Sequence, residues 1–221
     1  FDRFVEQGVE KVGLTGGEPL LRRDLPALVE RLAHKSAIRD LAMTTNAVLL
    51  KPAVHDLKRA GLHRLTISLD TLQRDRFIKL ARFDELPLRV AGIVAAVAPF
   101  PGFKIDTVII RGVNDDEIIP LLEFAKARRA EIRYIEYMDV GGATTWSMSQ
   151  VVSRKDILAT LARQYGPIEP LRESSSAPAD RYLERGAGRA PPDGGDGARR
   201  RADRRLRRDR ALARDLRRAR R

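Results

Sequence analysis

Residues 15–19 are the segment of this chain best suited to binding a small charged ligand. They read Thr15-Gly16-Gly17-Glu18-Pro19 and follow a short apolar run with the pattern of a β-strand. Two glycines at a strand end let a ligand approach the backbone closely, and the Glu18 carboxylate can accept hydrogen bonds from an ammonium group. The alternative is a tight strand-to-helix turn in which Glu18 is a solvated charge.

Other polar residues fall near the ends of further predicted strands. They are Thr44, Ser68, Lys104 and Met138. We expect these side chains to converge with Glu18 at one mouth, because parallel barrels carry functional residues at the C-terminal ends of their strands. Taken singly, Thr44 and Ser68 are typical of turns or caps, Met138 of a core and Lys104 of a surface-facing strand position.

Five apolar, β-branched runs alternate with amphipathic, helix-period segments. The predicted strands cover residues 11–15, 41–45, 64–69, 104–110 and 132–138. Repeated strand-then-helix units predict a parallel sheet with right-handed crossovers. The placement of the polar residues favours a TIM-type barrel over an open doubly wound sheet, although five strands are too few to close one.

Three helix starts carry recognisable signals. We expect Asp24 and Asn114 to act as N-caps of the helices that follow them. Ser153 and Asp156 have the spacing of a capping box.

Composition limits the classes of protein to consider. The chain has 221 residues, 43% hydrophobic and 33% charged, which suits one main soluble domain. No apolar run approaches the roughly 18 residues of a membrane span, so we expect a cytoplasmic protein without a membrane partner. The absence of cysteine excludes disulfides, cysteine nucleophiles and cysteine-ligated iron–sulfur clusters within this chain.

The net charge of +12 is concentrated in the last part of the chain. Residues 185–221 hold 15 arginines and 5 aspartates, hence +10, and use only Arg, Gly, Ala, Pro, Asp and Leu. We interpret this low-complexity tail as a frameshifted or disordered segment. Because the remainder is nearly neutral, a nucleic-acid partner is not expected. DNA binding through the tail stays as an alternative.

Five segments, in this order and at this spacing, resemble the molybdenum-cofactor biosynthesis protein A family, the GTP 3',8-cyclases of the radical S-adenosylmethionine superfamily. They are residues 11–24, 44–46, 67–72, 111–115 and 133–138. The resemblance covers about residues 1–181. It implies a partial TIM-type barrel that converts GTP, on the way to cyclic pyranopterin monophosphate, into (8S)-3',8-cyclo-7,8-dihydroguanosine 5'-triphosphate. The implied cofactors are S-adenosylmethionine and 4Fe-4S clusters.

The resemblance also implies roles for particular residues. Those matching S-adenosylmethionine-binding positions are Gly16, Gly17, Glu18, Ser68 and Met138, and those matching GTP-binding positions are Thr44 and Lys104. Gly13 stands where the family has an arginine that contacts GTP. The cluster cysteines of the family have no counterpart in this chain, so we expect the polypeptide as printed not to turn over GTP.

The predicted organisation follows from the same comparison. Residues 1–166 form a partial barrel that lacks its first strand and cluster loop, 167–184 begin the C-terminal cyclase region, and 185–221 are the tail. Cyclic pyranopterin monophosphate synthase is the implied pathway partner, and a homodimer stays open. The remaining alternatives are a peptide-modifying radical enzyme, a cofactor-free lyase with Lys104 as Schiff-base amine, and a non-functional gene fragment.

Overall fold

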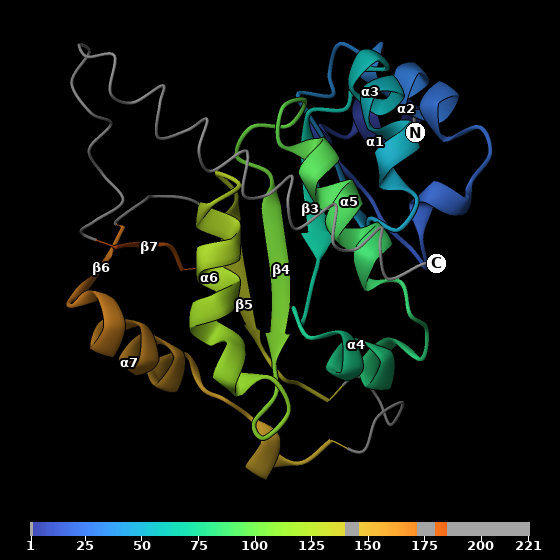
Figure 1. Ribbon diagram of the computed structural model, residues 1–221. Coiled ribbons are helices and arrows are strands. Elements are labelled where there is room, and N and C mark those ends of the chain that lie inside the picture. The colour runs from blue at the N-terminus through green and yellow to red at the C-terminus, as the bar shows by residue number, and fades with distance from the viewer. Residues whose placement is uncertain (1, 140–145, 172–179, 185–221) are drawn as a thin grey trace, which may run out of the picture. The chain divides into compact units, whose positions relative to one another are not determined.

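The structure, a computed structural model, describes residues 2–139, 146–171 and 180–184 (Figure 1). The predicted arginine-rich tail lies outside the described residues. Phe1–Ile168 and Glu169–Arg221 form two compact units, and each is described by itself. Strands β6 (Ile168–Pro170) and β7 (Tyr182–Glu184) pair in a two-stranded sheet. The division predicted after residue 166 stays a prediction.

The first unit is built on a five-stranded parallel sheet. Its order is β1 (Lys11–Leu14), β2 (Asp40–Thr45), β3 (Arg64–Ser68), β4 (Lys104–Ile109) and β5 (Glu131–Glu136). Every neighbouring pair is parallel. The predicted α/β class, parallel sheet and five strands are therefore confirmed, and the strand ends differ from the prediction by at most two residues.

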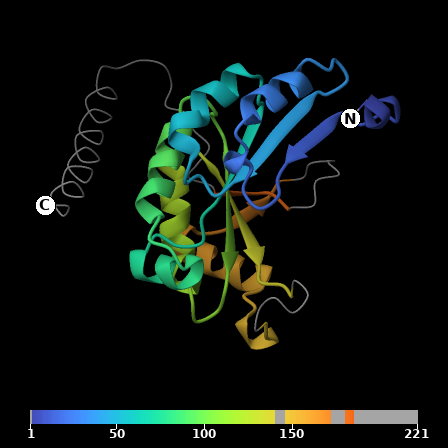
Figure 2. The ribbon, with the colours of Figure 1, turned by 90° about the vertical axis from the view of Figure 1, so that its right-hand side faces the viewer.

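Helices connect successive strands, as a parallel sheet requires. The α-helices are α1 (Asp2–Glu6), α2 (Leu25–Ala33), α3 (Leu50–Arg59), α4 (Arg74–Ala81), α5 (Leu86–Ala96), α6 (Ile118–Lys126) and α7 (Arg154–Tyr165). Short 3-10 turns are η1 (Pro19–Leu21), η2 (Asp115–Glu117) and η3 (Met148–Gln150). In Figure 2 most of these helices lie along one side of the sheet. Within the described ranges, no helix is long and apolar enough to cross a membrane.

The hydrophobic core lies between the sheet and these helices. On the sheet side, alternate aliphatic residues such as Leu41, Met43 and Ile105 are almost fully buried. Leu57 of α3 and Ile93 of α5 belong to the same cluster. Each such side chain contributes roughly 1.5–3 kcal/mol to the free energy of unfolding, so one face of the sheet is fixed by burial.

The capping predictions had mixed outcomes. Ser153 and Asp156 form the expected capping box at the start of α7. Asp24 occupies the N-cap position of α2 as predicted, but its side chain pairs with Arg22 and makes no capping hydrogen bond. Asn114 occupies the N-cap position of η2, the turn before α6, but its buried amide bonds to the backbone of Ile110 and Asp70 and makes no capping hydrogen bond.

Candidate functional site

The second face of the sheet carries mainly polar side chains, with a few small or aliphatic ones among them. Successive side chains of a strand point to opposite faces, so the residues that alternate with the buried core share this surface. We call it the polar face. It consists of Lys11, Gly13, Asp40, Ala42, Thr44, Arg64, Thr66, Ser68, Lys104, Asp106, Val108, Glu131, Arg133 and Ile135.

The strand register aligns these residues in rows across the sheet. Thr44 lies opposite Thr66, and Thr66 lies opposite Lys104. Thr44 and Lys104, the two residues predicted from the resemblance to bind one ligand, therefore flank Thr66 in a single row. Gly13 and Arg64 belong to the preceding row, where both are neighbours of Ala42.

Ion pairs between adjacent strands cover the polar face. Arg133 Nε and Nη2 donate to the two carboxylate oxygens of Asp106 at 2.6 and 2.7 Å. Lys104 Nζ lies 3.2 Å from Glu131 Oε1. Arg64 Nε donates to Asp40 Oδ1 at 2.7 Å.

The last of these pairs also affects proton binding. The hydrogen bond from Arg64 holds the pKa of Asp40 below its usual value. Partly exposed ion pairs contribute at most about 1 kcal/mol each to the free energy of unfolding. We therefore interpret the three pairs mainly as setting the pattern of charge on the polar face.

Glu18 joins the end of β1 to the end of β2. Its Oε1 accepts hydrogen bonds from Leu20 N at 3.0 Å and from Thr45 Oγ1 at 2.6 Å, and its Oε2 accepts one from Asn46 N at 2.7 Å. Glu18 is therefore not a freely solvated charge, and that alternative was wrong. The carboxylate is held in one orientation and keeps lone pairs for a further donor.

The two glycines beside Glu18 leave open space above the backbone. An added Cβ would meet nothing within 4 Å at either Gly16 or Gly17. Gly16 has φ +139°, a conformation that side chains rarely adopt. A ligand can therefore approach the backbone closely next to the fixed carboxylate.

The other predicted site residues are placed differently from one another. Ser68 ends β3 at the C-terminal edge of the sheet, and Met138 lies two residues beyond β5 on the same edge with 57% of its surface exposed. The core interpretation of Met138 was wrong. Lys104 is the first residue of β4, so it does not lie at the mouth where we expected it. It extends the site along the polar face.

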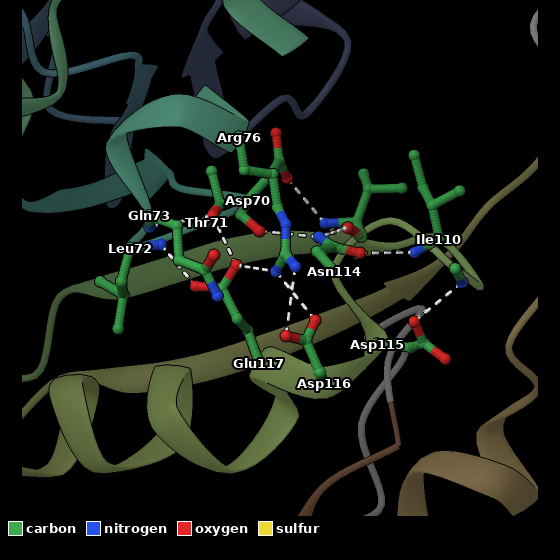
Figure 3. Close-up of polar contacts among 12 residues, drawn as sticks. Asp70, Thr71, Leu72, Gln73, Arg76, Ile110, Asn114, Asp115, Asp116 and Glu117 are labelled. Atoms are coloured by element: carbon green, nitrogen blue, oxygen red, sulfur yellow. Dashed lines mark hydrogen bonds and ion pairs between the residues drawn. The ribbon is translucent and has the colours of Figure 1, made fainter. Parts of the chain in front are cut away.

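Sequence reasoning missed a polar network beyond the ends of β3 and β4 (Figure 3). Glu117 is only 2% exposed and accepts hydrogen bonds from Leu72 N at 2.7 Å, from the Thr71 hydroxyl and from Arg76. Arg76 also bonds Asp116. These contacts tie the loop after β3 to the loop after β4.

Asn114 and Asp70 complete this network. The Asn114 amide nitrogen donates to the backbone oxygens of Asp70 at 2.7 Å and Val108 at 2.9 Å. Asp70 Oδ1 accepts a bond from Val108 N at 2.9 Å. Burial raises the pKa of Asp70 above its usual value. The network thus fixes the backbone immediately beyond Ser68.

Comparison with known families decides the classification. A family profile described as the radical SAM superfamily matches residues 1–125, more than half of the chain. The chain belongs to the radical SAM superfamily. This radical SAM chain shares its fold with a domain of pyruvate-formate lyase-activating enzyme from Bacteroides vulgatus, at TM-score 0.54 and 22% identity over 69% of this chain and 90% of that one.

Curated relatives are more similar in sequence. "GTP 3',8-cyclase 3" of Mycobacterium bovis is 50% identical over 186 residues, which cover 82% of this chain and 49% of the relative. "GTP 3',8-cyclase 1" of Mycobacterium tuberculosis is 49% identical over 198 residues, covering 87% and 53%. The radical SAM chain spans about half the length of these relatives.

The superfamily implies S-adenosylmethionine and a 4Fe-4S cluster as cofactors. The printed radical SAM sequence contains no cysteine, so no thiolate of this chain can ligate a cluster. The groups needed to bind S-adenosylmethionine, unlike the cluster ligands, are present in this chain. The amino-acid part of this cofactor needs a fixed carboxylate and an accessible backbone. Glu18 and the adjacent glycines supply both.

Proposed function

We propose that this chain is the barrel portion of a GTP 3',8-cyclase of molybdenum-cofactor biosynthesis, with S-adenosylmethionine at the strand ends and GTP along the polar face. The observation that carries the proposal is the row of Thr44, Thr66 and Lys104, which continues from the Glu18 mouth across a charged sheet surface. The names of the curated relatives support it. When bound, S-adenosylmethionine would supply the radical that starts the rearrangement of GTP.

At the mouth, Glu18 accepts hydrogen bonds from the ammonium group of S-adenosylmethionine. The backbone at Gly16 and Gly17 borders its methionine part, where the space is open. Ser68 binds its polar portion, and the exposed Met138 packs against its adenosine. The fixed orientation of Glu18 supports this assignment, since Thr45 and Asn46 hold the carboxylate before any ligand arrives.

Along the polar face, Thr44 and Lys104 bind GTP. A triphosphate at a partly buried surface requires cations and hydroxyl donors, and the row supplies both. The reaction product passes to cyclic pyranopterin monophosphate synthase in the cytoplasm. Dimerisation belongs to the same proposal, and a sedimentation experiment on the chain would measure it.

The proposal predicts that the chain binds both ligands and that Lys104 is specific to one of them. We expect the substitution Lys104→Met to weaken GTP binding about tenfold, since a charge-assisted hydrogen bond is lost. Binding of S-adenosylmethionine should be unchanged. Isothermal titration calorimetry with each ligand measures both affinities.

A matched control for this experiment is Lys79→Met, which removes an exposed lysine of α4 away from the polar face. It should leave both affinities unchanged. An equal loss of affinity for GTP in the two variants would contradict the placement of GTP along the polar face. A chain that binds neither ligand would contradict the whole proposal.

Gly13 offers a test in the opposite direction. An added Cβ there meets nothing within 4 Å, and its φ is not positive, so a long side chain fits above the polar face. We expect Gly13→Arg to tighten GTP binding about three- to tenfold, because it adds a cation in the row of Arg64. Titration with GTP and with guanosine, which lacks phosphate, measures the effect.

The uncharged variant Gly13→Met is the control for side-chain bulk. It should not tighten GTP binding. Gly13→Arg could instead increase the affinity for guanosine as much as the affinity for GTP. The added arginine would then not contact phosphate, and the placement of GTP over this row would be wrong.

A further inference from the structure

The three methionines of this chain differ widely in exposure. Met43 of β2 is 1% exposed, whereas Met138 and Met148 are 57% and 71% exposed. Met43 packs in the hydrophobic core, Met138 lies two residues beyond β5, and Met148 begins η3. Because the sequence contains no cysteine, all the sulfur of this chain is in these three side chains.

An exposed thioether reacts with hydrogen peroxide by transfer of one oxygen atom. The sulfur gives a lone pair to the new S–O bond, the O–O bond of the peroxide breaks, and the remaining oxygen leaves as water. The sulfur is oxidised by two electrons, and the peroxide is reduced by the same two. Since the reaction requires access to the sulfur, the exposures predict that Met138 and Met148 react and that Met43 is protected.

The backbone that leads to Met138 is held at the C-terminal edge of the sheet. β5 pairs with β4 as far as Glu136. Beyond the strand, Trp146 Nε1 donates to the backbone oxygen of Tyr137 at 3.3 Å. The exposed side chain of Met138 therefore begins from a fixed point on the edge that carries the mouth.

Oxidation would change what the Met138 side chain can contact. A thioether is apolar, flexible and polarizable, and it packs well on an aromatic ring. A sulfoxide is polar, and its oxygen loses hydrogen bonds to water when a ring covers it. An adenine that packs on Met138 should therefore bind more weakly after oxidation.

We propose that Met138 is a site of reversible oxidation by peroxides, and that one oxygen atom added to its sulfur weakens binding of S-adenosylmethionine. This assignment rests on the proposed function, because it needs the adenosine of S-adenosylmethionine at the mouth. It makes cofactor binding sensitive to peroxide in a chain that has no thiol.

The test exposes the whole chain to hydrogen peroxide and removes the excess with catalase before titration. Peptide mass spectrometry should find one added oxygen atom on Met138 and on Met148, and none on Met43. We expect isothermal titration calorimetry to show an affinity for S-adenosylmethionine about tenfold lower and an unchanged affinity for GTP. Methionine sulfoxide reductases A and B, which together reduce both sulfoxide epimers, should restore the lost affinity.

Met138→Leu and Met148→Leu form a matched pair of variants, because leucine resembles methionine in volume and cannot form a sulfoxide. Whatever its initial affinity for S-adenosylmethionine, Met138→Leu should show the same affinity before and after peroxide. Met148→Leu should lose affinity on treatment as the unsubstituted chain does. Met138→Gln places a polar group on a side chain of similar length and should bind weakly before any treatment.

Three results would overturn the inference and leave the placement of S-adenosylmethionine at Glu18 intact. Met138 could remain unoxidised while Met148 reacts, or it could be fully oxidised without any loss of affinity. The third result is an equal loss in Met138→Leu and the unsubstituted chain, which would assign the effect to oxidation elsewhere. Failure of the untreated chain to bind S-adenosylmethionine would instead contradict the proposed function itself.

Discussion

Replacing Gly92 with alanine is expected to destabilise the first unit by about 3 kcal/mol, although alanine favours a helix over glycine by about 1 kcal/mol. Gly92 lies within α5, and an added Cβ would lie 2.2 Å from the backbone oxygen of Ala47 and 3.2 Å from its Cβ. A backbone atom cannot move aside as a flexible side chain can. Steric overlap therefore outweighs the helix propensity. Urea unfolding followed by circular dichroism measures the change.

A compensating substitution controls for this explanation. Ala47 has φ +63°, which glycine adopts more readily than alanine. We expect Ala47→Gly to restore part of the stability of Gly92→Ala, because a more flexible backbone can shift its oxygen. An unchanged or increased stability of Gly92→Ala alone would show that α5 and the β2 end are not packed this closely.

Replacing Glu117 with alanine is expected to cost about 3–5 kcal/mol of the free energy of unfolding, the range for breaking a buried charged contact. The substitution leaves the Thr71 hydroxyl, the Leu72 N–H and Arg76 without this acceptor. A domain of this size is stable by only about 5–15 kcal/mol, so the loss is a large fraction of the total. Urea unfolding at neutral pH measures it.

The neighbouring carboxylate provides a matched control. Asp116 pairs with the same arginine, and its side chain is 58% exposed. Asp116→Ala should therefore cost less than about 1 kcal/mol. Equal losses in the two variants would mean that Arg76 alone accounts for the effect and that burial of Glu117 does not.

Much of the fold follows from sequence pattern, because alternation and helix period are local properties. The five strands could be placed to within two residues. Residues 15–19 and Ser68 could be placed at the mouth because a parallel sheet puts all its C-terminal strand ends on one edge. The placement of Lys104 at the mouth was wrong, because Lys104 is the first residue of both the predicted and the observed strand and the mouth lies at the C-terminal ends of the strands.

The pairing of polar groups could not be predicted in the same way. Thr45 reaches Glu18 only because the loop after β1 folds over the end of β2, and the chain order does not specify that contact. Arg89 is one charged residue on an amphipathic helix and resembles a surface residue in sequence. Its hydrogen bond to the backbone oxygen of Ser68 becomes visible only once α5 is packed against Ala47.

The three ion pairs of the polar face have a consequence for selectivity. Each cation is already paired with a carboxylate of the same protein on an adjacent strand, which is Asp40, Glu131 or Asp106. An anionic ligand must therefore compete with a carboxylate, and it gains little from releasing dissolved ions. Charge alone is therefore a weak attraction at such a surface, and we expect it to favour ligands whose polar groups match the spacing of the rows over unrelated polyanions.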